Sequence, residues 1–158
     1  MMEKKLANKN IENAAQDAKA LFSSGFNCAE SSLLSVCKAI GINSDAIPKI
    51  ATGFGGGVSR YGSICGALSG AVMAMGLAEG RKDPKDNEAK VKLYKKTAAF
   101  LDEFREEFGT IDCRELTGCN LLTEEGLAMF TNEKIHEEIC TGFVGFAVLK
   151  GIEMLKNK

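Results

Sequence analysis

The sequence contains no tryptophan, two prolines and a single histidine among its 158 residues. One histidine excludes a metal site built from several imidazoles, and it leaves only one candidate base for a cysteine–histidine catalytic pair. The charges nearly cancel, with 20 lysines and arginines against 21 acidic residues, so no overall basic field points to a nucleic acid partner. The longest apolar run, from Ile64 to Ala78, has 15 residues, whereas a membrane span needs about 20. We therefore expect neither nucleic acid binding nor membrane insertion.

The N-terminal residues lack the apolar core that a signal peptide has. This absence leads us to expect a cytoplasmic protein, in which thiols stay reduced. Six cysteines are present. In a reducing compartment they are expected to be metal ligands, redox groups or core residues before structural disulfides.

The apolar residues follow helical spacing, and no segment alternates as a strand does. We predict a single all-α domain over residues 1–158, folded as a multi-helix bundle around a central helix rich in small residues. That helix is expected from about Ser63 to Glu79. Small residues recur on it at every fourth position, which lets another helix approach closely, either inside the bundle, the favoured reading, or at a dimer face; they are Gly66, Gly70, Ala74 and Ala78.

Caps and glycines bound the other expected helices. Asn27 with Glu30 three residues later is close to a capping box, and Gly41 and Gly118 are expected to end two of the helices. Asp83-Pro84 predicts the start of a long helix that ends before Gly109. Its apolar residues step by three, four or seven and predict one buried stripe of Val91, Tyr94, Ala98, Leu101 and Phe108. The remaining helices are expected at 10–24, 27–40, 112–118, 123–130 and 133–155.

Three cysteines are expected in the first turn of a helix, namely Cys28, Cys65 and Cys113. There the helix dipole favours a thiolate by about 0.3–1 kcal/mol at an exposed position and so lowers the thiol pKa. Cys140 lies near an expected break in the last helix, where the same placement is less clearly indicated.

The other two cysteines and the histidine are less informative. Cys37 lies on the helix face opposite Cys28 and is predicted to be a small buried hydrophobe. Cys119, in a helix-ending turn, is either inert or a resolving thiol. His136 is four residues before Cys140 and so could share a metal with it, although an exposed histidine among glutamates needs no special role.

The spacing of the cysteines excludes several known sites. No pair is spaced as Cys-x-x-Cys, which zinc ribbons, thioredoxin-like sites and bacterial ferredoxins need, and no Cys-x-x-Cys-His is present for covalent haem c. Any shared site must therefore be assembled from separate helices.

Four blocks of the sequence resemble the family called C_GCAxxG_C_C, which is described as redox-active. They are Asn27-Cys28-Ala29-Glu30, Gly62-Ser63-Ile64-Cys65-Gly66-Ala67-Leu68-Ser69-Gly70, Cys113-Arg114-Glu115-Leu116-Thr117-Gly118 and Cys140. The resemblance extends from about residue 20 to residue 150. The central motif is Cys-Gly-Ala here, a small departure from the Gly-Cys-Ala of the family's name.

The resemblance implies that Cys28, Cys65, Cys113 and Cys140 form one redox-active site, with Gly62, Gly66 and Gly70 as cofactor-binding positions. A similar domain occurs in split-Soret cytochromes, where the cysteines are thought to hold an iron–sulfur cluster. Four thiolates suffice for such a cluster, which we expect as the occupant, serving electron transfer or redox sensing with an unidentified partner protein. Metal-free thiol–disulfide chemistry and a structural zinc site stay open as alternatives. A homodimer is expected, as is common for small proteins of this kind.

A glycine-rich loop, Gly53–Gly57, precedes the central motif. It fits no nucleotide-binding pattern, but its backbone N–H groups could donate to cluster sulfurs, or the loop could simply be a close-packed turn. Arg60 and Tyr61 follow it, where they could contact a ligand or a docking partner.

Overall fold

The computed structural model describes residues 2–156 of the chain, with side chains from Lys9 to Lys156. Within this part the fold is helical, and its strand-like pairing is limited to one isolated antiparallel bridge between Ile64 and Asp112. The predicted all-α fold class is therefore confirmed. The helical elements are α1 (Met2–Ser23), α2 (Cys28–Ile40), the 3₁₀ helix η1 (Lys49–Phe54), α3 (Gly66–Glu79), α4 (Asn87–Phe108), α5 (Cys113–Thr117), α6 (Glu124–Asn132), the π-helical segment η2 (His136–Cys140) and α7 (Thr141–Lys156).

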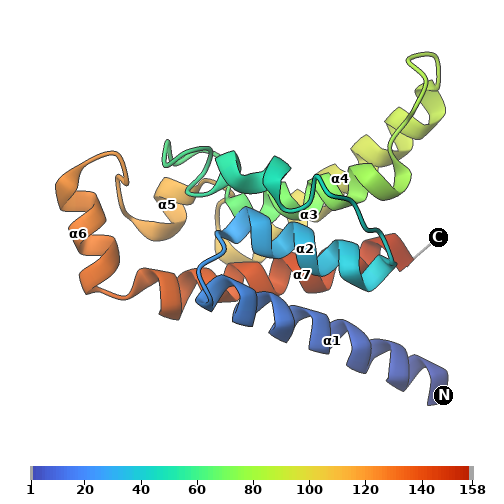
Figure 1. The fold of residues 1–158 in the computed structure, drawn as a ribbon. Coiled ribbons are helices and arrows are strands. Elements are labelled where there is room, and N and C mark those ends of the chain that lie inside the picture. Colours follow the sequence, from blue (N-terminus) through green and yellow to red (C-terminus); the bar gives the residue numbers. More distant parts are fainter. Residues whose placement is uncertain (1, 157–158) are drawn as a thin grey trace.

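Helices α1, α2, α3 and α7 pack side by side and form the body of the molecule (Figure 1). Helix α2 contacts α1, α3 and α7, and α7 also contacts α1 and α3. Fully buried aliphatic side chains from three of these helices fill the space between them, among them Leu33, Val36, Leu68, Val144 and Ile152. Burying each such side chain contributes about 1.5–3 kcal/mol.

Small residues on α3 bring it very close to α2. A Cβ atom on Gly70 would overlap the backbone of Ala29, and Ala74 is fully buried. The face that the sequence singled out is thus used inside the bundle, as the favoured alternative had it. Ala78, at the far end of this face, is exposed, so the close packing is confined to the part from Gly66 to Ala74.

The start of α4 differs from the prediction. The helix begins at Asn87 and is capped by Asp86, whose side chain accepts a hydrogen bond from the Ala89 N–H. Asp83-Pro84 instead forms a turn, in which Asp83 accepts from the Lys85 N–H. The end of the helix was predicted correctly, because Gly109 adopts the left-handed conformation that closes it.

The predicted buried stripe on α4 is only partly confirmed. Leu101 and Phe108 pack against the core, and Phe108 contacts Phe143 and Phe146. Val91 and Tyr94 are 46% and 65% exposed, whereas Phe100 and Phe104 are fully buried. The physical reason is visible in Figure 1, where the first half of α4 and the end of α3 project from the body as an arm. Only the second half of α4 reaches the core, and there Phe104 contacts Phe143 and Phe146 of α7.

The first turn of several helices meets at one end of the body. Figure 1 shows α2, α3 and α7 starting at the end where α5 and α6 lie, while α1 begins and α7 ends at the other end. None of the helices that the structure describes combines the length and apolar character needed to cross a lipid bilayer.

Candidate functional site

The four motif cysteines line one cavity of about 540 Å³ at the end of the body where α5 and α6 lie. Each comes from a different segment: Cys28 is the first residue of α2, Cys65 caps α3, Cys113 is the first residue of α5, and Cys140 is the last residue of η2. Cys65 and Cys113 are buried, and Cys28 and Cys140 keep partial exposure. The structure thus brings these four side chains together, although most of the chain separates the first from the last.

A complete capping box fixes Cys28 at the start of α2. The Asn27 side chain accepts hydrogen bonds from the N–H groups of Ala29 and Glu30, both 3.0 Å long, and the Glu30 carboxylate accepts one of 2.8 Å from the Asn27 N–H. The same two side chains also hold the end of η1, because Asn27 donates to the Thr52 carbonyl and Glu30 accepts from the Thr52 hydroxyl. The sequence predicted this cap correctly, and the cap orients the segment that carries Cys28.

Backbone hydrogen bonds between two distant segments hold Cys65 beside Cys113. The Cys65 N–H donates to the Ile111 carbonyl at 2.8 Å, and the Cys113 N–H donates to the Ser63 carbonyl at 2.7 Å. These bonds flank the bridge between Ile64 and Asp112. Because buried backbone groups need partners, the pairing fixes the spacing of the two cysteines without relying on their side chains.

Cys28 Sγ lies among backbone N–H donors. Those of Gly56, Ala29 and Gly66, together with its own, act to lower the pKa of its thiol. A Cβ atom on residue 66 would overlap this sulfur and would lie 2.8 Å from the Phe54 carbonyl oxygen. Gly66 is therefore required at this position, because any side chain would displace the thiol.

Gly62 and Gly70, the other two glycines expected to bind a cofactor, have protein neighbours. A Cβ atom on Gly62 would lie 2.7 Å from Cβ of Arg114, and Gly70 packs against α2. Both positions need glycine for close packing of the chain on itself.

Burial raises the pKa of all four motif cysteines. It is the largest influence on Cys113 and Cys140, whose pKa rises to about 12. Mutual repulsion between the ionised thiols adds to this effect, and it couples Cys65 to each of the other three. The N–H donors near Cys28 lower its pKa only part of the way back. The predicted lowering at helix starts is therefore wrong, because desolvation outweighs a dipole effect of about 0.3–1 kcal/mol.

The predicted helix positions of the cysteines also need two corrections. Cys65 is the cap of α3 rather than a residue of its first turn. Cys140 joins the π-helical segment η2 directly to α7, so the expected break is an irregular turn within a continuous helical run. A π-helical turn is rare and frequently marks a functional position.

The two remaining cysteines stand outside the cavity lining. Cys37 is 1% exposed in the main core, which confirms that it is a small buried hydrophobe. Cys119, also 1% exposed, packs in a separate cluster with Cys113, Leu121 and Ile135, against which Cys140 also packs. Its thiol donates to the Thr117 carbonyl at 3.4 Å.

Aromatic side chains that the sequence did not indicate complete much of the lining, namely Phe22, Phe26, Phe130 and Phe143. The His136 ring, which was expected to be exposed, is half-buried and also lines the cavity. It stacks on Phe22, with ring centroids 3.8 Å apart and planes 19° from parallel. The four-residue spacing between His136 and Cys140 was the one feature of the sequence that indicated a position for His136 in this cavity.

The glycine loop continues into a left-handed turn. Gly56 and Gly57 have φ angles of +65° and +66°, and Val58, Ser59 and Arg60 follow with +62°, +49° and +71°. A left-handed conformation costs about 1–2 kcal/mol for each residue that carries a Cβ atom. Gly57 is needed here for a further reason, since a Cβ atom on it would lie 2.7 Å from Cβ of Cys113. Strain of this kind concentrates at functional sites.

The lining thus combines four thiols, converging N–H donors and an aromatic wall. No group of three or more histidine, cysteine, aspartate or glutamate side chains within the described residues already stands in the arrangement that would hold a single metal ion. The chemistry of the donor set nevertheless suits an iron–sulfur group, because thiolates are its usual ligands and N–H donors to sulfur tune its potential.

Comparison with known proteins bears on this cavity. The family described as “Putative redox-active protein (C_GCAxxG_C_C)” matches residues 26–154. The chain belongs to this family. All four cysteines of this C_GCAxxG_C_C protein that line the cavity fall within the match. A protein of Archaeoglobus fulgidus named “Uncharacterized protein” is 32% identical over 115 residues, which cover 68% of this chain and 76% of that protein. No solved structure matches the chain.

Proposed function

We propose that Cys28, Cys65, Cys113 and Cys140 hold an iron–sulfur cluster and that the protein transfers electrons or senses redox state through it. The observation that carries this proposal is the convergence of four thiols from four segments on one cavity. The membership of a family described as redox-active supports it. Bound at these thiols, a cluster would supply one-electron chemistry.

The electrostatics of the cavity favour a bound cation-containing group over free thiolates. Four thiols this close repel one another when ionised, and burial adds to the cost. Metal ions remove this cost, because they displace the thiol protons and neutralise the charge. A metal-free thiol nucleophile would instead need a lowered pKa.

The protein's own groups would act on a bound cluster in two ways. The N–H groups of Gly56, Ala29 and Gly66 stabilise negative charge at the Cys28 sulfur and would therefore raise the reduction potential of a bound cluster. The aromatic side chains and the half-buried His136 would supply the apolar part of its surroundings. The N–H groups and the apolar side chains already hold these positions in the folded protein.

Anaerobic purification followed by analysis of iron, acid-labile sulfide and zinc tests the proposal. We expect brown protein that contains iron and sulfide, with absorption and electron paramagnetic resonance spectra of a cluster. Zinc without sulfide would indicate a structural zinc site in place of the cluster. A metal-free protein whose mass falls by two hydrogen atoms for each disulfide formed on oxidation would indicate thiol–disulfide chemistry.

Serine variants of each motif cysteine locate the group. C28S, C65S, C113S and C140S are each expected to lose most of the iron, whereas C37S, which alters a buried thiol remote from the cavity, should keep it. If all four variants kept the metal content and redox behaviour of the unmodified protein, the assignment would be wrong.

We also propose a cytoplasmic location, a homodimer and a redox partner protein. Four free thiols in one cavity suit a reducing compartment. Light scattering coupled to size exclusion tests the dimer. A single-chain mass of 16.9 kDa at working concentrations would contradict it.

A further inference from the structure

The cavity that holds the thiols also has room and lining for a small organic molecule. Its volume of about 540 Å³ lies within the range of about 300–1,000 Å³ that is usual for ligand pockets. Beyond the thiols, its lining includes Phe22, Phe26, Leu127 and Phe130. Flat apolar groups pack well against such aromatic walls.

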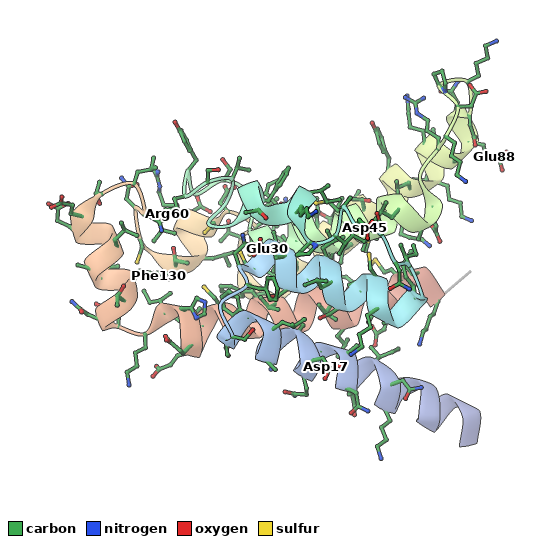
Figure 2. The ribbon with its side chains drawn as sticks, viewed as in Figure 1. Asp17, Glu30, Asp45, Arg60, Glu88 and Phe130 are labelled. Atoms are coloured by element: carbon green, nitrogen blue, oxygen red, sulfur yellow. The ribbon has the colours of Figure 1, made fainter. Side chains whose placement is uncertain are left out.

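The charge of the lining is one-sided. Arg60 contributes a guanidinium, and none of the described residues that line the cavity is an aspartate or glutamate. Figure 2 shows Arg60 and Phe130 at the same end of the molecule, on the loop and on α6 respectively. Glu137 acts on Cys140 from outside the lining, and the thiols carry no charge while they are protonated. The positive charge is therefore confined to the Arg60 side of the cavity, where it favours an anion.

The side chain of Arg60 makes no polar contact that holds the fold together. In the part of the chain whose side chains are described, its guanidinium has neither a hydrogen bond nor an ion pair. Its neighbour Arg114 differs, since it donates to the Tyr61 carbonyl and to Asn120 at 3.1 Å each. Arg60 also sits at φ +71°, the third non-glycine residue in the left-handed turn. Arg60 is exposed where it lines the cavity, so its guanidinium is available to pair with an anion there.

We propose that this cavity binds a small organic anion with an aromatic or otherwise flat apolar body. The body lies against Phe22, Phe26 and Phe130, and a carboxylate, sulfonate or phosphate group pairs with the Arg60 guanidinium. In relation to the cluster this inference rests on the proposed function, because the molecule would then be the substrate class that the redox group serves. Binding itself depends only on the cavity and Arg60.

Two naphthalene probes that differ in charge test the proposal. 2-Naphthoate carries a carboxylate, and 2-naphthamide has the same shape without the charge. Both fluoresce, and the chain contains no tryptophan to interfere. Equilibrium dialysis of each probe against the anaerobically purified protein is expected to show binding of 2-naphthoate at least about 10-fold tighter than that of 2-naphthamide, as a charge-assisted pair provides.

Variants of Arg60 test whether this residue recognises the carboxylate of 2-naphthoate. R60N suits the left-handed backbone, since asparagine tolerates it, and it should abolish the preference for 2-naphthoate. R60K keeps the charge and should retain part of the preference. R81Q, at an exposed arginine whose guanidinium donates to the Pro84 carbonyl outside the cavity, should leave it unchanged. Circular dichroism checks that each variant is folded.

Equal binding of the two probes, no binding of either, or an R60N variant that still prefers 2-naphthoate would overturn the inference. Iron and sulfide are measured in the same samples, which separates the two proposals. Charge-selective binding without a cluster would support the anion site and contradict the proposed function. A loaded cluster without charge-selective binding would support the proposed function and contradict the anion site.

Discussion

Gly66 stands directly against the thiol of Cys28, so closely that a single added methyl group would overlap the sulfur atom. The Cys-Gly pair at 65 and 66 therefore serves two cysteines at once. Cys65 contributes its own thiol, and Gly66 leaves space for another thiol while directing an N–H group at it. This relationship gives a physical reason for a glycine immediately after the second motif cysteine.

Replacing Gly66 with alanine should damage the site more than the fold. We expect G66A to lower the iron content severalfold and to reduce the free energy of unfolding by about 1–3 kcal/mol, since the new methyl group also meets the Phe54 carbonyl. Iron analysis and urea unfolding measure the two effects. G76A is the matched control in the same helix, because nothing lies within 4 Å of its added Cβ atom, and it should be neutral or stabilising by up to about 1 kcal/mol.

Removal of the cap at Asn27 should loosen the segment that carries Cys28. N27A loses the hydrogen bonds to the Ala29 and Glu30 N–H groups and to the Thr52 carbonyl. We expect a loss of about 0.5–2 kcal/mol in the free energy of unfolding, measured by urea titration. N27D keeps the capping oxygen and should recover most of this loss; an N27D variant as unstable as N27A would show that the Thr52 contact dominates.

The stability of the metal-free protein should fall as pH rises above about 9. Burial raises the pKa of Cys113 from 9.0 to about 12 in the folded state, so between these values the unfolded chain has released a proton that the folded chain keeps. Each such thiol lowers the free energy of unfolding by about 1.4 kcal/mol per pH unit across this window. Below about pH 9 both states are protonated and the stability is unaffected.

Comparison with C113S isolates the contribution of this thiol. Lysines and tyrosines titrate in the same range, so the relevant quantity is the difference between the two urea midpoints from pH 8 to pH 11. The variant should lose stability less steeply. Identical slopes would mean that Cys113 is not desolvated in the folded protein.

Truncation of aromatic side chains on α4 should distinguish the two faces of the helix. F100A is expected to reduce the free energy of unfolding by about 3–5 kcal/mol, because Phe100 is fully buried. Y94A removes a ring that is 65% exposed and should change stability by less than about 0.5 kcal/mol. Urea unfolding of both variants measures this, and a larger effect for Y94A would place the arm in contact with the body or with a second copy.

Local signals predicted the ends of helices well. Asn27 with Glu30 fixes the start of α2, and the glycines at 41, 109 and 118 close α2, α4 and α5 in the left-handed conformation. Each of these features depends on residues within four positions of one another. For the same reason the Asp83-Pro84 signal was misleading, since a turn and a helix start use the same residues.

The grouping of the cysteines has no such local signal. Spacing alone left the site unassembled, and only the family resemblance connected the four thiols. The pairing of residues 62–65 with residues 111–114 depends on hydrogen bonds between segments that are far apart in sequence. The direction of the pKa shifts was missed likewise, because burial is a property of the whole fold, whereas a helix start is visible in the sequence.

The distribution of the four thiols along the chain has a mechanical consequence. A group that joins Cys28 to Cys140 closes a ring of polypeptide that includes α3, α4, α5 and α6. Such a link removes conformational freedom from the unfolded chain and so stabilises the folded state, and this stabilisation grows with the number of residues enclosed. Without this link, α5 and α6 are held by the small hydrophobic cluster around Cys113, Cys119, Leu121 and Ile135 and by the pairing with residues 62–65. This end of the protein should then be the first that proteases cleave, so copies without the bound group would be degraded.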